Sequence, residues 1–424
     1  MPGLLPARLA LAARLLAAEG PRSLVERWRD RRRDEARSRR FTLADTATPL
    51  PPGARSPTLW FLPFPMQRRR GGAAIQLLVR LEERAATEPV AVLQRLGDRF
   101  RCELWGRGVE RPLALEWLRE RSDDAAAPAF LDDSAGPILS EAARWVGATR
   151  LHFESLVDLP LTLPIALRER GLPFGISAHD FALYCPRPHL LEEPSGRFCD
   201  FSADPSRCSR CLAASWSLRP GFQEERRAVA RRLLALADRV EFPSESTRRE
   251  HLRLFPELTP ERTRVIPPHS LVEGTPHRTV EHPPRRIAFA GAVHRHKGAL
   301  EFESVVRRLE AQQPGRYRWH VFGGGDPALL GRLRRLPRTR VHGYFRAGSL
   351  PARLVAAEID LVLLPSIWPE AHCLVLDECA AAGVPVVAFA LGALGERVLA
   401  GGLGEVVDPG AGADGLADRI ASLG

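Results

Sequence analysis

The sequence contains almost no lysine. Among its 61 basic side chains only Lys297 is a lysine, and the others are arginine. Since either residue can supply a generic surface charge, a position that keeps lysine indicates a need for a compact, flexible ammonium group rather than a planar guanidinium. The alternative is that Lys297 is a lysine only by chance and lies on a solvated turn without a functional role.

Long hydrophobic runs are also missing. Hydrophobic residues make up 45% of the 424 positions, which is ordinary for a globular protein, and no apolar run reaches the roughly 20 residues of a membrane-spanning helix. Residues 1–18 are rich in Leu and Ala, but Arg8 and Arg14 interrupt them, which argues against a signal peptide. We therefore expect a cytoplasmic protein.

The net charge of +10 is concentrated at the N-terminus. Residues 1–40 hold 11 Arg and 5 acidic residues, a net +6, which leaves +4 for the rest of the chain. The pI near 10.0 is therefore weak evidence for nucleic-acid binding, and we expect no nucleic-acid partner. The leucines and Trp28 among these arginines predict a helix that could lie on an anionic membrane surface. A helical linker, or a solvated arm packed on the main body, is the alternative.

The remainder alternates short apolar strands with amphipathic helices, in two blocks. This pattern predicts an α/β fold with two Rossmann-like domains, whose parallel sheets bind ligands at the carboxyl ends of their strands. Proline-rich segments set the boundaries: a basic helical arm over 1–50, a domain over 55–268 and a domain over 284–424. The expected strands are 58–64, 102–105, 150–153 and 174–179 in the first domain, and 287–290, 319–322, 340–341, 359–364 and 384–389 in the second.

Lys297 lies in a loop that follows the first strand of the second domain. The segment begins at Gly291, ends at Lys297-Gly298 and leads into a helical pattern. A glycine turn, a cation and a helix start can present an ammonium group and backbone N–H groups to a phosphate. Gly324 stands in a triple glycine after the next strand, where the backbone can approach a ligand closely.

Two glutamates follow the fourth strand of this domain. Glu370 is expected in the loop before a short helix, and Glu378 inside that helix among apolar residues. A carboxylate among apolar neighbours is costly unless something bonds it, and sugar hydroxyls would serve. The alternative is a surface-facing Glu378 beside Asp377 on an ordinary helix.

Taken in order, these motifs resemble the family 4 glycosyltransferases of GT-B fold, over roughly residues 57–420. The matching patterns are Gly-x5-Lys-Gly, Pro-Ser-x-Trp-x-Glu-x7-Glu and Ala-Gly-Val-Pro-Val-Val. The resemblance implies two domains facing across a cleft. It also implies transfer of a sugar from a nucleotide-sugar donor, with retention of anomeric configuration and without a catalytic metal or other cofactor.

The resemblance also implies roles for individual residues. Lys297 would meet the donor diphosphate, Glu370 the sugar hydroxyls and Glu378 the ribose. Backbone near Tyr344 would hold the nucleobase, and the N–H groups of two residues at a helix start would face the phosphates. The two residues at the helix start are Cys373 and Leu374. The other donor-binding residues expected on this basis are Gly291, Arg295, Gly298, Gly324, Gly71 and Gly72.

Two positions depart from the family pattern. Ala292 stands where the family often has arginine, and Arg295 could take over that charge. Cys373 stands where the family often has glycine. Both departures bear on donor identity and efficiency.

The acceptor side of the resemblance rests on the first domain. His179-Asp180-Phe181, followed by Cys-Pro-Arg and Cys-x2-Cys, resembles a bacterial surface-polysaccharide subset of the family. The resemblance places His179 near the reacting sugar, where it would position donor or acceptor. A strand-end histidine satisfied by the backbone is the alternative, and a flexible turn is the alternative for the Gly71-Gly72 loop.

Four of the seven cysteines cluster within residues 185–211. A cytosolic location argues against stable disulfides. Four thiolates could hold a structural zinc ion tetrahedrally, and free buried thiols are the alternative. The four residues are Cys185, Cys199, Cys208 and Cys211.

The sequence thus predicts a glycosyltransferase acting on a glycan or lipid-linked glycan, in cell-envelope polysaccharide or lipopolysaccharide synthesis. The basic arm, residues 1–40, would contact the inner face of the cytoplasmic membrane. A GT-B epimerase or phosphorylase, and a sugar-nucleotide-binding scaffold without turnover, are the alternatives. After residues 406–410 one short helical pattern, 415–423, follows, and the helix with which the family commonly crosses back to the first domain is not evident.

Overall fold

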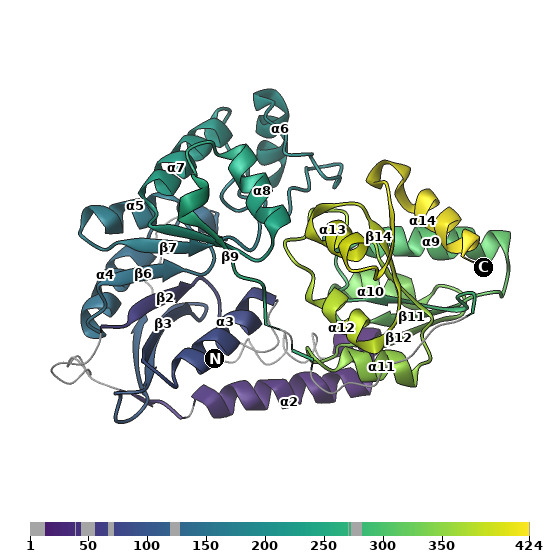
Figure 1. The fold of residues 1–424 in the computed structure, drawn as a ribbon, viewed down its shortest axis with the longest axis horizontal. Coiled ribbons are helices and arrows are strands. Elements are labelled where there is room, and N and C mark those ends of the chain that lie inside the picture. Colours follow the sequence, from purple (N-terminus) through teal and green to yellow (C-terminus); the bar gives the residue numbers. More distant parts are fainter. Residues whose placement is uncertain are drawn as a thin grey trace. The chain divides into compact units, whose positions relative to one another are not determined.

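The computed structural model describes residues 13–38, 40–43, 56–66, 72–118, 128–269, 271–272 and 282–423, and Figure 1 labels many of their elements. The chain forms two compact units. The N-terminal unit is Arg33–His269, and the C-terminal unit combines Met1–Arg32 with Ser270–Gly424. The boundary therefore falls within helix α2 (Pro21–Ser38), and residues 1–32 group with the C-terminal block.

The N-terminal unit contains a nine-stranded sheet in the described residues, in the order β1-β5-β4-β3-β2-β6-β7-β8-β9. Most strand pairs are parallel, as predicted, but β4 is antiparallel to both of its neighbours. The three residues between β3 and β4 include Gly97 at φ +74, and a hairpin this short can only join antiparallel strands. The strands are β1 (Thr42–Leu43), β2 (Thr58–Leu62), β3 (Pro89–Arg95), β4 (Arg99–Gly106), β5 (Leu113–Leu118), β6 (Arg150–Phe153), β7 (Phe174–Ser177), β8 (Arg239–Phe242) and β9 (Thr263–Val265).

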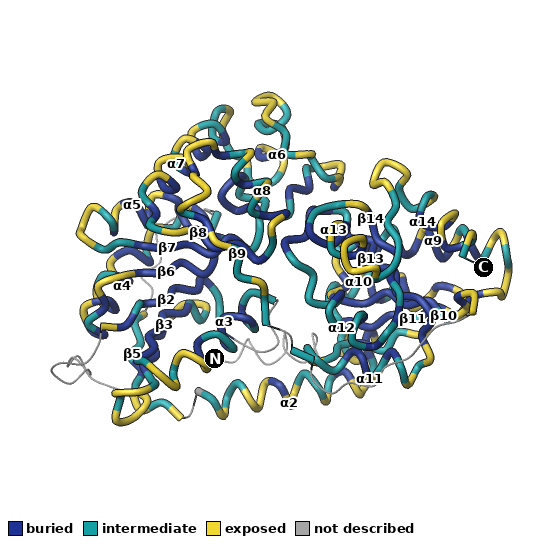
Figure 2. The backbone as a smooth tube through the Cα atoms, in the orientation of Figure 1, coloured by how far each residue is buried: buried dark blue, intermediate teal, exposed yellow. Residues whose placement is uncertain are grey.

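Helices cover this sheet because each has one apolar face. Leu77, Leu78 and Leu81 of α3 pack with Trp60 and Leu62 of β2 in one core cluster. Figure 2 shows the strands as buried and the outer helix faces as exposed. The helices are α3 (Gly72–Arg84), α4 (Ala135–Trp145), α5 (Thr162–Glu169), α6 (Pro205–Trp216), α7 (Phe222–Leu236) and α8 (Glu245–Leu254).

The C-terminal unit contains a six-stranded sheet in the part of the chain described, in the order β12-β11-β10-β13-β14-β15. All of its strand pairs are parallel. The chain moves outward in one direction from β10 and in the other from β13, so the strand order reverses between these two neighbours. Ligands of open α/β sheets bind at the carboxyl ends at such a reversal. The strands are β10 (Arg286–Ala290), β11 (Arg318–Phe322), β12 (Thr339–Gly343), β13 (Leu361–Leu364), β14 (Val386–Phe389) and β15 (Gly404–Val407).

Two hydrophobic clusters show which helices cover each face of this sheet. One cluster joins the sheet to α9, α10 and α14, and the other joins it to α11, α12 and α13. The helices are α9 (Ala299–Gln312), α10 (Pro327–Arg334), α11 (Leu350–Ala356), α12 (Leu374–Ala382), α13 (Gly392–Ala400) and α14 (Gly412–Ser422).

Residues 13–32 of the arginine-rich N-terminal segment pack on the C-terminal unit. Ala18 belongs to the core cluster of that unit. In α2, Ser23 Oγ accepts the backbone N–H of Tyr344 at 2.9 Å, and Asp30 accepts the hydroxyl of Tyr344 at 2.7 Å. The opposite side of α2 leaves Trp28 and Val25 exposed. No described helix combines the length and apolar character needed to span a bilayer, and residues 1–12 lie outside the described range.

Candidate active site

The loops after β10 and β13 bring together the two residues that the sequence singled out most strongly. Lys297 Nζ donates to Glu370 Oε2 at 2.7 Å, and Ser366 Oγ donates to Glu370 Oε1. The Lys297 ammonium also lies 5.6 Å from the ring centroid of Trp368. The lone lysine is therefore held by a carboxylate at the reversal of strand order.

Close packing of the two loops sets this geometry. Because β10 and β13 are neighbouring parallel strands, their loops emerge side by side. The Ile367 N–H donates to the carbonyl of His296 at 3.1 Å. Gly298 has φ +78, and a Cβ atom there would overlap the carbonyl of Pro365. Glycine is thus required at this position by both backbone conformation and space.

The Lys297–Glu370 pair is charged. Burial raises the pKa of the Glu370 carboxyl, but the charge of Lys297 and hydrogen bonds from Lys297 and Ser366 outweigh it, so the pKa lies below its usual range. Burial lowers the pKa of Lys297, and the charge of Glu370 more than reverses that effect. The glutamate is 4% exposed. The pair therefore supplies an ammonium group that is fixed in direction before any ligand arrives.

The loop between Glu370 and α12 is fixed by a second ion pair. Arg397 donates to the carbonyls of His372 at 2.8 Å and Cys373 at 3.3 Å, and it pairs with Asp377. Cys373 has φ +73 at the start of α12, a left-handed conformation that costs a non-glycine residue about 1–2 kcal/mol. This explains why glycine would suit the position. Leu374 begins the helix, whose N-terminus favours anions.

Glu378 is buried within α12, so the surface-facing alternative is wrong. Its Oε1 accepts the backbone N–H groups of Gly348 at 2.8 Å and Leu350 at 3.1 Å. Burial raises the pKa of this carboxyl to about 7. The structure therefore connects Glu378 to the loop after β12.

Replacing Glu378 with glutamine is expected to remove a pH dependence of stability. Glu378 ionises near its ordinary pKa of 4.5 in the unfolded chain and near 7 in the folded chain. The protonated carboxyl therefore makes its full contribution to the free energy of unfolding below about pH 4.5, and this contribution is lost as the pH rises to about 7. The variant cannot ionise and keeps an oxygen acceptor. Denaturant unfolding from pH 4.5 to 8 should show the wild type falling relative to the variant, and a constant difference would contradict the assignment.

Helix α2 and the residues before it lie against the loops that follow β11 and β12 in the C-terminal unit. A Cβ atom at Gly324 would overlap the side chains of Arg27 and Glu19. The Arg27 guanidinium lies 4.6 Å from the ring centroid of Tyr344. Around Gly324 and Tyr344 the close approach is therefore made by the chain's own N-terminal arm, in agreement with the alternative of an arm packed on the main body.

The other expected donor residues are more dispersed. Gly291 has φ +123, and its N–H donates to the carbonyl of Phe322 at 2.9 Å. Arg295 is exposed, and its charge acts on the carboxyl of Glu301. Gly72 begins α3 in the N-terminal unit, and Gly71 lies outside the described residues.

A polar cluster surrounds His179 at the carboxyl ends of β6 and β7. His179 Nε2 bonds Glu154 Oε1 at 2.8 Å, and Ser177 Oγ donates to Glu154 Oε2 at 3.0 Å. His152 bonds Ser177 at 2.8 Å, and Arg80 lies 3.8 Å from Glu154. His179 is therefore held by a carboxylate, not only by backbone. Sequence reasoning missed Glu154, although polar residues at alternate positions of both strand ends were a usable signal.

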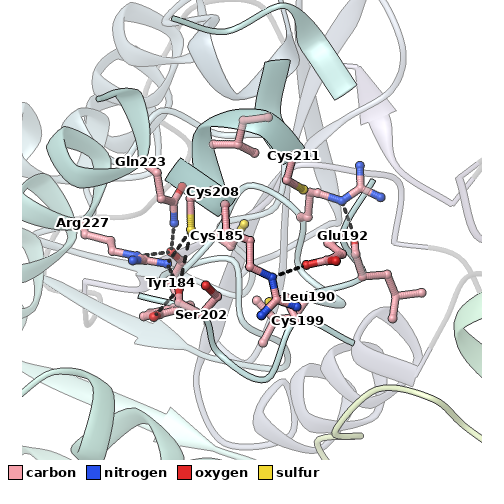
Figure 3. A pocket seen from close by; sticks show the side chains of 14 residues that line it. Tyr184, Cys185, Leu190, Glu192, Cys199, Ser202, Cys208, Cys211, Gln223 and Arg227 are labelled. Carbon is pink, nitrogen blue, oxygen red and sulfur yellow. Dashed lines mark hydrogen bonds and ion pairs between the residues drawn. The ribbon is translucent and has the colours of Figure 1, made fainter. Parts of the chain in front are cut away.

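The four clustered cysteines line one pocket (Figure 3), and all are free thiols. The Cys208 thiol donates to the carbonyl of Ser202 at 3.5 Å, and Cys211 Sγ accepts the N–H of Glu193 at 3.3 Å. Burial raises the pKa of the Cys185 thiol to about 12. No group of three or more His, Cys, Asp or Glu among the described residues is placed to hold a metal ion. The structural zinc ion at these four cysteines stays a prediction, with free thiols as the alternative.

Comparisons with known proteins give a family match for the C-terminal part of the chain. Residues 284–424 match the family model of glycosyl transferases group 1. No curated protein sequence matches the chain.

The structure resembles solved glycosyltransferase structures. Anabaena Alr3699/HepE in complex with UDP is 17% identical, with a TM-score of 0.53 over 86% of this chain and 89% of that one. A glycosyltransferase from Rickettsia africae is 12% identical, with a TM-score of 0.51 over 87% and 88%. Trehalose-6-phosphate synthase, studied for glycosyl transfer with retention, is 14% identical, with a TM-score of 0.52 over 87% and 91%. At such identities the likeness establishes the fold, which is GT-B.

Proposed function

We propose that this chain, whose residues 284–424 match glycosyl transferases group 1, transfers a sugar from a nucleotide-sugar donor held by its C-terminal unit. The observation that carries the proposal is the pairing of the only lysine in the sequence with buried Glu370. This pair lies where the strand order reverses, the usual ligand position in such sheets.

The chemistry requires stabilisation of the departing diphosphate. Negative charge grows on the phosphate oxygens as the sugar bond breaks, and a cation already fixed in place stabilises it without reorganisation. Lys297 is such a cation, and the N-terminus of α12 adds backbone N–H groups. Glu370 orients Lys297 and can accept hydrogen bonds from sugar hydroxyls. HepE was solved with UDP, so uridine nucleotides are the first donors to test.

Retention and the acceptor follow from the family resemblance. The departing phosphate would help deprotonate the acceptor hydroxyl on the same face, so the mechanism needs no protein nucleophile, metal or other cofactor. The acceptor would be a glycan or lipid-linked glycan of the cell envelope, reached from the cytoplasmic side. Exposed Trp28 and Val25 among the arginines of α2 support contact with an anionic membrane.

A sugar-nucleotide-binding scaffold without turnover is a second candidate. It is favoured by Cys373, which has φ +73 at the start of α12 where the family often has glycine, and by Ala292, which stands where the family often has arginine. Binding without turnover would support the scaffold.

A thermal-shift panel of nucleoside diphosphates and their sugars tests the proposal on the wild type and Lys297→Ala. A ligand that binds only the folded state raises the melting temperature. We expect a base-selective rise that Lys297→Ala abolishes. No rise with any nucleotide, in protein shown to be folded, would overturn the donor site.

A further inference from the structure

Glu154 is the most deeply buried acidic side chain beside His179. It follows β6, and its N–H donates to the carbonyl of Phe61 at 2.9 Å, so its backbone is fixed against β2. His179 follows β7, the strand that pairs in parallel with β6. The Glu154 side chain is fully buried, whereas that of His179 is 20% exposed. The pair thus joins an interior carboxylate to an imidazole that reaches the carboxyl edge of the sheet.

The hydrogen-bond directions around Glu154 can be assigned. Burial raises the pKa of Glu154, but the hydrogen bond from His179 and the charges of His179 and Arg80 bring it below its usual range. An ionised carboxylate only accepts hydrogen bonds. Ser177 must therefore donate to Glu154, and it accepts from His152 Nε2–H. This agrees with a neutral His152, since burial lowers its pKa to about 4.

The contact with Glu154 also fixes the tautomer of His179 whenever its ring is neutral, although a charged ring would carry a hydrogen on both nitrogens. Its Nε2 lies 2.8 Å from Glu154 Oε1 and must carry a hydrogen to donate. In the neutral ring the other nitrogen, Nδ1, is then an acceptor, and it lies on the side of the ring away from Glu154. Without Glu154 the two tautomers would be closer in energy, and an Nδ1–H form could not accept a hydroxyl hydrogen.

We propose that Glu154 is a positioning residue that holds His179 in the Nε2–H tautomer, so that Nδ1 accepts a hydrogen bond from a hydroxyl group of the sugar substrate. The substrate part of this proposal rests on the proposed glycosyltransferase function. The tautomer part rests only on the contacts of the N-terminal unit. Glu154→Gln preserves shape but removes the charge, and its amide can donate or accept, so the tautomer preference is lost.

The test combines nitrogen-15 NMR of histidine-labelled full-length protein with kinetics. The His179 signals are assigned from their loss in His179→Gln. The wild type should show an unprotonated Nδ1 and Glu154→Gln a mixture of tautomers. Ser177→Ala is the matched control, because it removes the hydrogen bond to the other oxygen of Glu154 and should leave the His179 tautomer unchanged.

Kinetics then tests the role toward substrate. Loss of the carboxylate that orients a metal-bound histidine costs about 10–100-fold, and we expect a fall of similar size in kcat/KM for Glu154→Gln at an unchanged melting temperature, and a much smaller one for Ser177→Ala. A neutral His179 ring with the hydrogen on Nδ1 in the wild type, or an unchanged tautomer and kcat/KM in Glu154→Gln, would overturn the proposal. If Glu154→Gln fails to fold, the wild-type spectrum still decides the tautomer. Absence of turnover with every donor would count against the glycosyltransferase function and leave the NMR result for Glu154 valid.

Discussion

Replacing Lys297 with methionine is expected to lower kcat/KM for the nucleotide sugar by about 100–1,000-fold, the usual cost of removing one preorganised group that stabilises developing charge. The substitution removes the ammonium group that Glu370 holds at 2.7 Å. It should also destabilise the fold, because Glu370 stays buried without its counter-ion. Breaking a buried pair costs about 3–5 kcal/mol, and the lower end applies because the Lys297 side chain is 26% exposed.

A double variant separates these two effects. Lys297→Met with Glu370→Gln removes both charges, so the free energy of unfolding should recover towards the wild-type value while activity stays low. Lys297→Arg keeps the charge on a planar group and should retain stability better than activity. Full activity in a folded Lys297→Met protein would show that Lys297 has no functional role and is a lysine only by chance.

The second large effect is expected from Gly298→Ala, measured against Gly402→Ala. Both glycines have left-handed φ, at +78 and +59, but a Cβ atom at Gly402 meets nothing within 4 Å, whereas one at Gly298 overlaps the Pro365 carbonyl. Gly402→Ala should cost only the conformational strain, about 1–2 kcal/mol. Gly298→Ala adds a backbone clash and should cost about 3–5 kcal/mol.

Activity distinguishes the two glycine variants as well. Separation of the loops after β10 and β13 would move Lys297 away from Glu370, so Gly298→Ala should lose most turnover even at temperatures where it is folded. Gly402→Ala should keep it. Equal losses of stability in the two variants, measured by denaturant unfolding, would show that loop packing does not set the geometry of the ion pair.

The sequence predicted the C-terminal sheet more closely than the N-terminal one. Strands β10, β13 and β14 are mostly apolar and buried on both faces, which parallel sheets produce. The expected strands include part of β4 but lack β1, β3, β5, β8 and β9 of the first sheet and β15 of the second. β5 and β15 are only half-buried, so their residues carry a weaker pattern.

The separation of residues along the sequence explains which parts of the site could be predicted. Lys297, Glu370 and His179 stand in motifs whose spacing is local to one loop or strand end. Glu154 is 25 positions from His179, and their contact depends on the pairing of β6 with β7. The packing of α2 on Gly324 and Tyr344 was equally hidden, because an amphipathic helix shows that it covers something but not what it covers.

The most direct test of the donor site is a crystal structure with the nucleoside diphosphate that gives the largest thermal shift. We expect a phosphate oxygen about 3 Å from Lys297 Nζ, a normal distance for a charge-assisted hydrogen bond. We also expect the diphosphate near the N-terminus of α12. A nucleotide bound elsewhere, with Lys297 still contacting only Glu370, would contradict the proposed donor site.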